Sequence, residues 1–277
     1  MRPLVLKLGG ELLEDPQRLG LTAAAIGGIT AAGPLVIVHG GGKEIDAALR
    51  TAGIEKRQVD GLRVTDERTL AVVISVLAGT INTRLVAALT TSGVPAVGLT
   101  GADAGCGLSE PAPLHSTTDG RVVDLGRVGV PAAGADMRVL ETLVTDGFVP
   151  VVACIGIGTD GTLFNVNADM FAGHLAAKLG ARRLVIAGTT PGVFGANGTT
   201  IEQLDQLAIA RLLSDGTATA GMVAKLRACE EALANGVDDV VIVDGRDLSA
   251  LAVAATDRAP VDATRIVRDV RSGVLPK

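Results

Sequence analysis

Apolar and polar residues follow one another along the chain in blocks that predict strands followed by helices. The apolar runs at 3–8 and 34–38 are typical of buried strands. The segment 14–32 predicts a polar turn followed by a helix, and 43–52 predicts a second helix. A long helix is predicted at 67–91, where the apolar positions repeat with a period of 3.6 residues. This βαβα opening favours a parallel sheet with helices on its faces.

The same alternation continues through the rest of the chain. After a strand at 94–99, the region 105–134 is rich in glycine, proline and polar residues and predicts a β-hairpin over the sheet edge. Further helices are predicted at 136–146, 169–180, 202–213, 222–235 and 247–255, and further strands at 148–155, 184–187, 239–243 and 264–268. The tail 269–277 is expected to be disordered.

Composition narrows the class of protein. The chain has 277 residues and is 48% hydrophobic, enough for a large core in one α/β unit or in two lobes. Its net charge is −5 and it lacks tryptophan and tyrosine, so a nucleic-acid surface is not expected. It has neither a secretion signal nor an uninterrupted apolar run of membrane-spanning length. We therefore expect a soluble, cytoplasmic protein that spans no membrane.

Cysteine usage agrees with that location. Cys106, Cys154 and Cys229 are far apart and show neither CxxC nor mixed Cys/His spacing. Neither a disulfide framework nor a zinc site is indicated. We expect free thiols in a reducing cytosol.

Two glycine-rich turns near the amino terminus form the first candidate site. The segments Lys7-Leu-Gly9-Gly10 and His39-Gly-Gly-Gly42 each end a predicted strand and lead towards a helix. A helix start leaves backbone N–H groups unpaired, and glycine has no Cβ to keep an anion away. One such turn alone fits a plain βα connection. Two of them, one carrying Lys7, predict a phosphate cradle at a single crevice.

Other polar residues stand at the starts of predicted helices. Asn165, Asn167 and Asp169 alternate along an extended segment and can project to one side towards a ligand, or form an Asn-rich turn in which Asp169 caps the helix. Lys225 is predicted in the first turn of its helix, where an anionic ligand would explain a cation better than surface placement does. Arg63 is either an exposed turn residue or binds a carboxylate through its guanidinium group.

These residues together fit phosphoryl transfer. Backbone donors and two lysines that converge on anionic oxygens would stabilise a transition state whose charge is spread over the equatorial oxygens. None of the three histidines stands out as a general base. A carboxylate acceptor needs no such base, because it is already ionised at neutral pH.

The motifs also resemble those of the amino acid kinase family. They occur in the family's order across residues 4–243 and read Lys7-Leu-Gly-Gly10, His39-Gly-Gly-Gly-Lys-Glu-Ile-Asp46, Gly61-Leu-Arg63-Val-Thr65, Asn165-Val-Asn167-Ala-Asp169 and Gly221-Met222-Val-Ala-Lys225. The resemblance implies a three-layer α/β/α sandwich with a mainly parallel central sheet, as in carbamate kinase. It also implies an amino-terminal lobe, 1–180, for substrate binding and dimerisation, and a carboxy-terminal lobe, 181–277, for the nucleotide.

Within the family, the motifs look like those of members that phosphorylate the γ-carboxylate of N-acetyl-L-glutamate with ATP and Mg²⁺, the second step of arginine biosynthesis. The metal would be held mainly by ATP rather than by protein side chains. The alternatives are a kinase for a related carboxylate, such as an aminoadipate derivative or carbamate, and a ligand-sensing protein without turnover.

The resemblance implies a homodimer formed through the helix at 67–91. The resemblance also implies insensitivity to arginine, because arginine-inhibited members of the family carry an extra helix ahead of the first strand, which here is predicted to begin at residue 3.

The resemblance assigns a role to each motif residue. Lys7 and Lys225 would stabilise the transferred phosphoryl group, and Asp169 would hold both lysines. The residues expected to bind the nucleotide and its phosphates are Gly9, Gly10, Gly41, Gly42, Thr189, Gly221 and Met222. The residues expected to bind the amino-acid substrate are Gly41, Gly42, Arg63, Asn165 and Asn167. Thr189 departs from the acidic or amide residue usual in the family, and Ala224 departs from a common proline.

Overall fold

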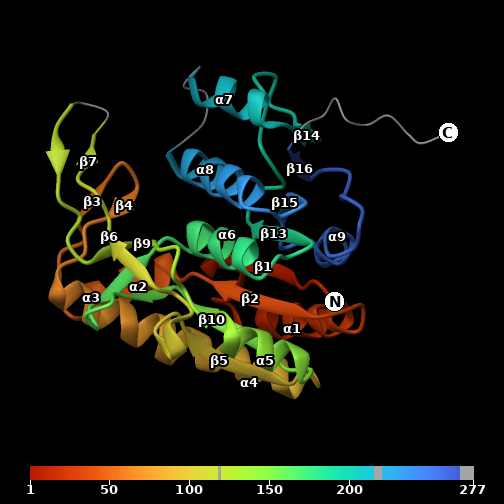
Figure 1. Ribbon diagram of the computed structural model, residues 1–277, viewed down its shortest axis with the longest axis horizontal. Helices are drawn as coiled ribbons and strands as arrows, with labels where there is room; N and C mark the ends of the chain where they lie inside the picture. Colours follow the sequence, from red (N-terminus) through yellow and green to blue (C-terminus); the bar gives the residue numbers. More distant parts are fainter. Residues whose placement is uncertain (118–119, 215–219, 269–277) are drawn as a thin grey trace.

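The computed structural model describes residues 1–117, 120–214 and 220–268. The tail 269–277, predicted to be disordered, lies outside the described residues. The helices are α1 (Pro16–Thr30), α2 (Gly42–Thr51), α3 (Glu67–Ile74), α4 (Thr83–Thr91), α5 (Arg138–Thr145), α6 (Ala168–Lys178), α7 (Gln206–Ser214), α8 (Ala220–Ala234) and α9 (Leu248–Ala254). Figure 1 shows them packed around a central sheet.

The described residues form a central sheet of eight strands. Their order across the sheet is β14 (Gln203–Leu204), β16 (Thr264–Val267), β15 (Asp239–Asp244), β13 (Arg183–Gly188), β1 (Leu4–Leu8), β2 (Leu35–His39), β10 (Val149–Ala153) and β5 (Ala96–Thr100). Neighbouring strands are parallel except β15 and β16, which are antiparallel. The expected mainly parallel sheet is confirmed.

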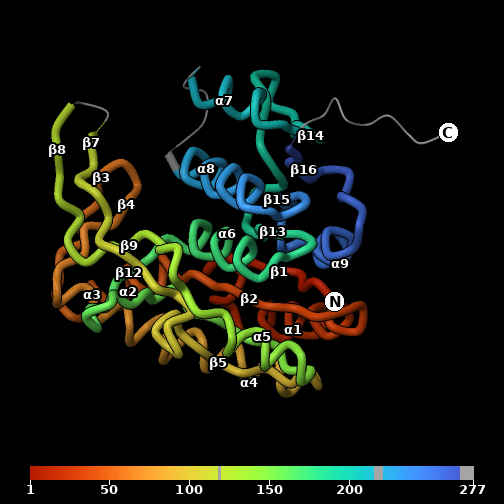
Figure 2. Tube along the Cα trace, in the orientation of Figure 1, coloured from red at the N-terminus to blue at the C-terminus, as the bar shows by residue number. Residues whose placement is uncertain are grey.

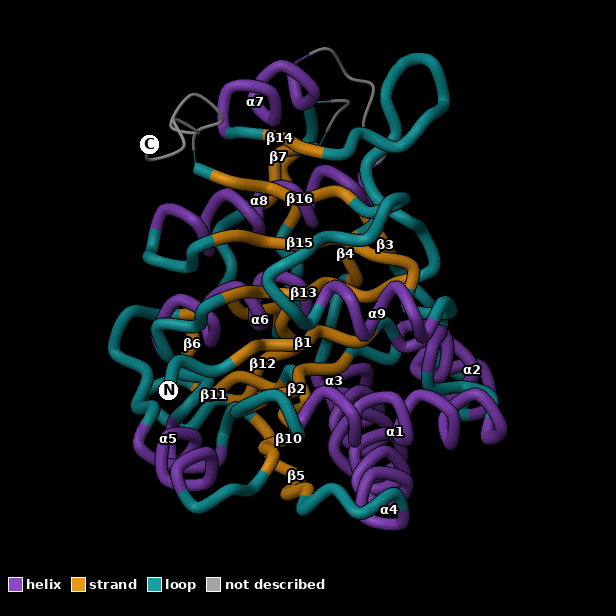
Figure 3. Tube along the Cα trace, turned by 90° about the vertical axis from the view of Figure 1, so that its right-hand side faces the viewer, coloured by secondary structure: helices purple, strands orange, loops and turns teal. Residues whose placement is uncertain are grey.

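Helices cover both faces of this sheet, which gives the expected three layers. Figure 3 shows α5, α6 and α8 on one side and α1, α4 and α9 on the other. Contacts between α6 and α8, and between α1 and both α4 and α9, join the helices within each layer. Every residue of β1 and β2 is buried, because a strand inside a covered parallel sheet has no face in water.

A second, smaller sheet lies beyond the carboxyl ends of the central strands. It contains β11 (Ile155–Ile157), β12 (Leu163–Val166), β9 (Val128–Pro131) and β6 (Ser109–Pro111) in that order. The hairpin predicted within 105–134 is confirmed as β7 (His115–Ser116) and β8 (Val122–Val123), which extend away from the body in Figure 2. The strand predicted at 148–155 is confirmed as β10 but ends earlier, because the chain leaves the central sheet after Ala153 and enters the smaller sheet at β11.

The long helix predicted at 67–91 is confirmed, although its middle is wound differently. A π-helical segment, Ser75–Asn82, joins α3 to α4, and Asp66 caps the start by accepting a hydrogen bond from the N–H of Thr69 at 2.7 Å. Among the described residues, Glu67–Thr91 is the one helix long and apolar enough to cross a membrane by length and composition. Core helices pass the same test, and Leu77, Ile81 and other residues of this helix belong to the core.

Three local predictions need correction. The helix predicted at 202–213 begins later, at Gln206, because Gln203–Leu204 pairs with β16 as a strand. The helix predicted at 222–235 begins earlier, at Ala220, so Lys225 lies in its second turn and not in its first. A hairpin of β3 (Gln58–Val59) and β4 (Leu62–Arg63) was not predicted, although its Asp-Gly turn is typical of hairpins.

Candidate active site

The two glycine turns lie against each other. Strands β1 and β2 are in register, with Leu8 opposite His39, so the turns that follow them leave the sheet side by side. A Cβ on Gly10 would lie 2.7 Å from the Cα of Gly41, and a Cβ on Gly41 would lie 2.1 Å from the Cδ1 of Ile81. Neither position has space for a side chain. The turns therefore form one backbone surface, as the sequence predicts.

This surface is one wall of an open cavity of about 280 Å³. Gly9, Gly10 and residues 40–42 line it, and no side chain caps the helical starts that follow Gly9 and Gly41. Backbone N–H groups in the first turn of α2 are therefore available to a ligand, and the dipole of this helix favours a negative one. The cavity fits the phosphate chain of a nucleotide, because the glycines that line it present backbone N–H groups with no side chain in front of them.

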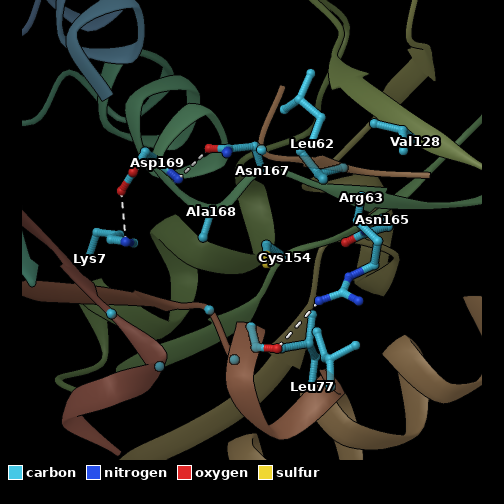
Figure 4. A pocket seen from close by; sticks show the side chains of 18 of the residues that line it. Lys7, Leu62, Arg63, Leu77, Val128, Cys154, Asn165, Asn167, Ala168 and Asp169 are labelled. Carbon is cyan, nitrogen blue, oxygen red and sulfur yellow. Dashed lines mark hydrogen bonds and ion pairs between the residues drawn. The ribbon is translucent and has the colours of Figure 1, made fainter. Parts of the chain in front are cut away.

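Asp169 joins two lysines that are far apart in the sequence. Its Oδ1 lies 2.8 Å from the Nζ of Lys7, and its Oδ2 accepts a hydrogen bond from the Nζ of Lys225 at 2.9 Å. Lys7 is on β1, Asp169 is in the first turn of α6, and Lys225 is on α8. The packing of α6 against both β1 and α8 brings the three together. Figure 4 shows Lys7 and Asp169 at one end of the cavity.

The electrostatics of this triad favour its ionised form. Burial by itself raises the pKa of the Asp169 carboxyl, but the charges of Lys7 and Lys225 outweigh burial and hold that pKa below its usual range. Burial likewise opposes the charge on Lys7, yet Asp169 raises the pKa of Lys7 above its ordinary value. Two ammonium groups around one carboxylate carry a net charge of +1, which suits an anionic ligand.

The two asparagines have different partners. Asn167 caps α6, because its side-chain oxygen accepts hydrogen bonds from the N–H groups of Asp169 and Met170 at 2.9 and 3.1 Å. The alternative in which Asp169 caps the helix is wrong, because Asn167 is the cap and the Asp169 carboxylate is paired with the lysines. Asn165 donates a hydrogen bond to the hydroxyl oxygen of Thr65 at 3.2 Å. Both asparagines line the cavity, as Figure 4 shows.

Arg63 is not the exposed turn residue that the sequence allows as one alternative. Its side chain is only 9% exposed and lines the cavity opposite Lys7 in Figure 4. One terminal nitrogen, Nη2, donates to the Asp46 carboxylate and to the Gly42 carbonyl oxygen, the latter at 3.4 Å. The other, Nη1, is buried and has no hydrogen-bond partner. Arg63 therefore grips a carboxylate of the protein itself and keeps one nitrogen for another acceptor.

Lys225 and three of the predicted nucleotide residues lie outside this cavity. Thr189 follows β13, and its carbonyl oxygen accepts a hydrogen bond from Arg246 at 2.9 Å. Gly221 is exposed and Met222 is half-buried at the start of α8. Because Gly9 donates to the carbonyl oxygen of Ala187 at 2.8 Å, the loop after β13 lies next to the first glycine turn. Binding of nucleotide by these three residues stays a prediction.

No histidine is among the described residues that line the cavity. His39 ends β2 fully buried, with its Nε2 3.0 Å from the side-chain nitrogen of Asn82 and its Nδ1 3.3 Å from the Gly40 carbonyl oxygen. This pairing suits a neutral ring that carries its proton on Nδ1. Burial lowers the pKa of His39 to about 4, so the ring is neutral at physiological pH. His39 supports the glycine turn and does not act as a base in the cavity.

Acid is expected to destabilise the fold through His39. Its pKa in the folded chain lies below the ordinary value of 6.5, so between about pH 6.5 and 4 the unfolded chain binds one more proton than the folded chain. Stability is therefore lost as the pH falls through this range. The free energy of unfolding should drop by about 2 kcal/mol between pH 7 and pH 5 through this residue.

Urea unfolding at both pH values measures this loss, and His39→Gln should reduce it by the same amount. Burial also lowers the pKa of His174 to about 4, which adds a second contribution that the variant retains. An unchanged pH dependence in His39→Gln would show that the buried ring does not cause the loss.

Comparison with known proteins agrees with the geometry. Residues 2–244 match the amino acid kinase family. The chain belongs to this family. It is 40% identical to the acetylglutamate kinase of Novosphingobium aromaticivorans over 88% of this chain and 84% of that protein. It is 42% identical to the acetylglutamate kinase of Rhizorhabdus wittichii over 92% of this chain and 86% of that protein.

Solved structures of other amino acid kinase folds also resemble it. N-acetylglutamate synthase from Neisseria gonorrhoeae, complexed with coenzyme A and N-acetyl-glutamate, has a TM-score of 0.82 and 28% identity. The match covers 97% of this chain and 60% of the synthase chain. Carbamate kinase from Giardia lamblia bound to AMP-PNP has a TM-score of 0.68 at 17% identity, covering 97% and 99% of the two chains. This second likeness shows the shared fold, as the sequence resemblance implies.

Several cavity residues of this amino acid kinase were missed at the level of sequence. They are Glu11, Ile45, Gln58, Leu62, Leu77, Val128, Cys154 and Ala168. The Asp-Gly turn was a usable signal for the hairpin that carries Gln58 and Leu62. The others come from helices, strands and short connections, and which of their side chains face the cavity is known only after packing. Cys154 is a free buried thiol, as are Cys106 and Cys229, so the predicted absence of disulfides is confirmed for all three.

Proposed function

We propose that this chain transfers the γ-phosphoryl group of ATP to the γ-carboxylate of N-acetyl-L-glutamate, forming N-acetyl-L-glutamyl 5-phosphate in arginine biosynthesis. The observation that carries the proposal is the Lys7–Asp169–Lys225 triad beside a glycine surface that excludes side chains. Relatives about 40% identical over most of the chain, named acetylglutamate kinase, support the choice of substrate.

The proposed step needs charge stabilisation rather than a base. An oxygen of the substrate carboxylate attacks the γ-phosphorus, the bond from this phosphorus to the bridging oxygen breaks, and ADP leaves with that oxygen. Lys7 and Lys225 offset the negative charge on the transferring group, and Asp169 holds both ammonium groups in place. Asp169 itself is a poor base, because its carboxylate is paired with both lysines and its pKa is lowered.

For the nucleotide, we propose that backbone N–H groups of Gly9, Gly10, Gly41 and Gly42 receive the phosphates. Gly221, Met222 and Thr189 would contact the rest of ATP. Among the described residues, no group of three or more His, Cys, Asp or Glu side chains is placed to hold a metal ion. Mg²⁺ would accordingly be bound mainly by the phosphate oxygens, where it offsets their charge.

For the amino-acid substrate, we propose that the buried Nη1 of Arg63 donates to the α-carboxylate, with Asn165, Asn167 and the backbone of Gly41 and Gly42 nearby. A planar guanidinium held on one side by the protein presents a fixed donor to a carboxylate on the other. This arrangement explains why Arg63 is buried in the cavity wall although one of its nitrogens has no protein partner.

Replacing Arg63 by lysine should raise the KM for N-acetylglutamate by about tenfold, because an ammonium reaches neither Asp46 nor the substrate with the same geometry. Turnover at saturating substrate should change much less, because the contact is made equally before and during the reaction. Steady-state kinetics with each substrate varied in turn measure both quantities. An unchanged KM would show that Arg63 does not bind the α-carboxylate.

We further propose two lobes, 1–180 and 181–277, and a cytoplasmic homodimer. The lobe division is supported by the sheet order, because β13 to β16 occupy one end of the sheet and the remaining strands the other. The dimer would form through Glu67–Thr91, whose outward positions include the exposed small residues Ala71, Gly79 and Ala87. Small residues let a second helix approach closely. Size-exclusion chromatography with light scattering measures the assembly.

The experiment that tests the proposed reaction is trapping of the acyl phosphate with hydroxylamine. The purified chain is given ATP and Mg²⁺ with N-acetyl-L-glutamate, glutamate, an N-acetylated aminoadipate or carbamate. We expect hydroxamate from N-acetylglutamate at the highest kcat/KM, together with ADP. A preference for the aminoadipate derivative or carbamate would make the chain a kinase for that carboxylate. Turnover with none of them would favour a ligand-sensing protein.

A further inference from the structure

One carboxylate holds the β3–β4 hairpin against α2. Asp46, at the start of the second turn of α2, accepts a hydrogen bond from the Nζ of Lys56 at 2.7 Å and another from the Nη2 of Arg63. Lys56 precedes the hairpin and Arg63 ends it, so Asp46 contacts both sides of its base. The hairpin turn has φ of 47° at Asp60 and 80° at Gly61, which makes it a tight two-residue turn. A short hairpin anchored at its base has little freedom to move.

The Arg63 guanidinium is shared between this anchor and the cavity. Its Nη2 is occupied by Asp46 and the Gly42 carbonyl oxygen, whereas its buried Nη1 has no partner. Arg63 lines the cavity and Asp46 does not. An unpaired buried nitrogen of this kind costs free energy until an acceptor reaches it. Asp46 therefore makes no contact of its own with a ligand in the cavity and reaches it through the orientation of Arg63 or through its charge.

We propose that Asp46 is a positioning residue that makes the enzyme select substrates with a second carboxylate. By holding Nη2, it keeps Nη1 directed towards the ligand, so that Arg63 need not be ordered when the substrate binds. The inference rests on the proposed function, in which Arg63 receives the α-carboxylate. It adds that the selection depends on a residue that does not touch the substrate.

The Asp46→Asn variant distinguishes a role of Asp46 through its charge from a role through orienting Arg63, because the two predict opposite changes in substrate binding. The cluster of Asp46, Lys56 and Arg63 carries a net charge of +1, and Asp46→Asn raises it to +2. If the carboxylate acted only through its charge, the variant would bind an anionic substrate more tightly. If it acts by orienting Arg63, binding weakens, because a neutral amide holds the guanidinium less firmly than a carboxylate does.

The test compares two substrates that differ only in the α-carboxylate. N-acetyl-L-glutamate has it, and 4-acetamidobutanoate lacks it but keeps the reacting carboxylate. For Asp46→Asn we expect the KM for N-acetylglutamate to rise about tenfold, with kcat and the KM for ATP within about twofold of wild type. The kcat/KM for 4-acetamidobutanoate, or its inhibition constant if turnover is too slow, should not change. Asp46→Glu should restore part of the preference.

Lys56→Met is the matched control. It removes the other partner of Asp46 but leaves Arg63 in place, and the Lys56 side chain is 41% exposed and therefore screened by water. Its KM for N-acetylglutamate should stay within about twofold of wild type. A rise as large as that of Asp46→Asn, a lower KM in Asp46→Asn, or equal losses on both substrates would overturn the inference.

Failure of the proposed function is separately visible. If the wild-type chain forms no acyl phosphate from N-acetylglutamate, the proposed reaction is refuted by that result alone. Calorimetric titration of N-acetylglutamate into wild type and Asp46→Asn then tests the positioning role without turnover. Weaker binding by the variant supports the role, and equal or absent binding overturns it.

Discussion

Lys225→Ala is expected to lower kcat by about a thousandfold, while the KM values for ATP and N-acetylglutamate change only a few-fold. The ammonium of Lys225 lies 2.9 Å from Asp169 and is only 14% exposed, so water cannot replace its charge effectively. The positive charge of Lys225 matters most in the transition state, where negative charge moves towards the bridging oxygen. Turnover should therefore fall far more than substrate affinity.

Lys178→Ala provides the control for this result. Lys178 lies on α6 with Asp169 but donates to the Ala133 carbonyl oxygen, outside the triad. Its removal should leave kcat near the wild-type value. Steady-state rates of ADP formation for both variants decide the outcome. Comparable losses in the two variants, or a Lys225→Ala defect confined to KM, would contradict a role for Lys225 in the transition state.

Among substitutions that add one methyl group to the cavity, Gly10→Ala should reduce stability and ATP binding the most. The new Cβ would lie 2.7 Å from the Cα of Gly41, which is backbone and cannot turn away as a flexible side chain can. Forcing the two turns apart should cost about 2 kcal/mol of stability. It should also raise the KM for ATP at least about tenfold, because the N–H groups of the two turns no longer point at the same phosphates. Thermal or urea unfolding and ATP kinetics measure the two effects.

Gly20→Ala is the matched substitution for comparison. Gly20 lies within α1, and a Cβ there would meet no atom within 4 Å. Alanine should stabilise the helix by up to about 1 kcal/mol and leave the kinetics unchanged. If Gly10→Ala behaved like Gly20→Ala, the glycine turns would have more room than the structure shows, and the phosphate cradle would be in doubt.

The elements predicted most accurately are those whose signal is local. β1 and β2 are short runs dominated by Leu, Val and Ile and followed by glycines, and the helix at 67–91 has a sustained 3.6-residue period, so each can be recognised from neighbouring residues alone. β14 and β6 are only two and three residues long and exist through pairing with distant strands. No period can be read from so few residues, and these strands were missed.

The sequence by itself determined the parallel α/β architecture, the glycine turns at the ends of β1 and β2, and the residue types that bind anions. These depend on side-chain period and on the absence of Cβ atoms, which are properties of short segments. The family resemblance already implied that Asp169 holds Lys7 and Lys225, and the ion pairs confirm it. Only the tertiary structure decided that Asn167 caps α6 and that Asp46 holds Arg63. Those roles depend on which side chains meet across the packed sheet and helices, and spacing along the chain does not specify such distances.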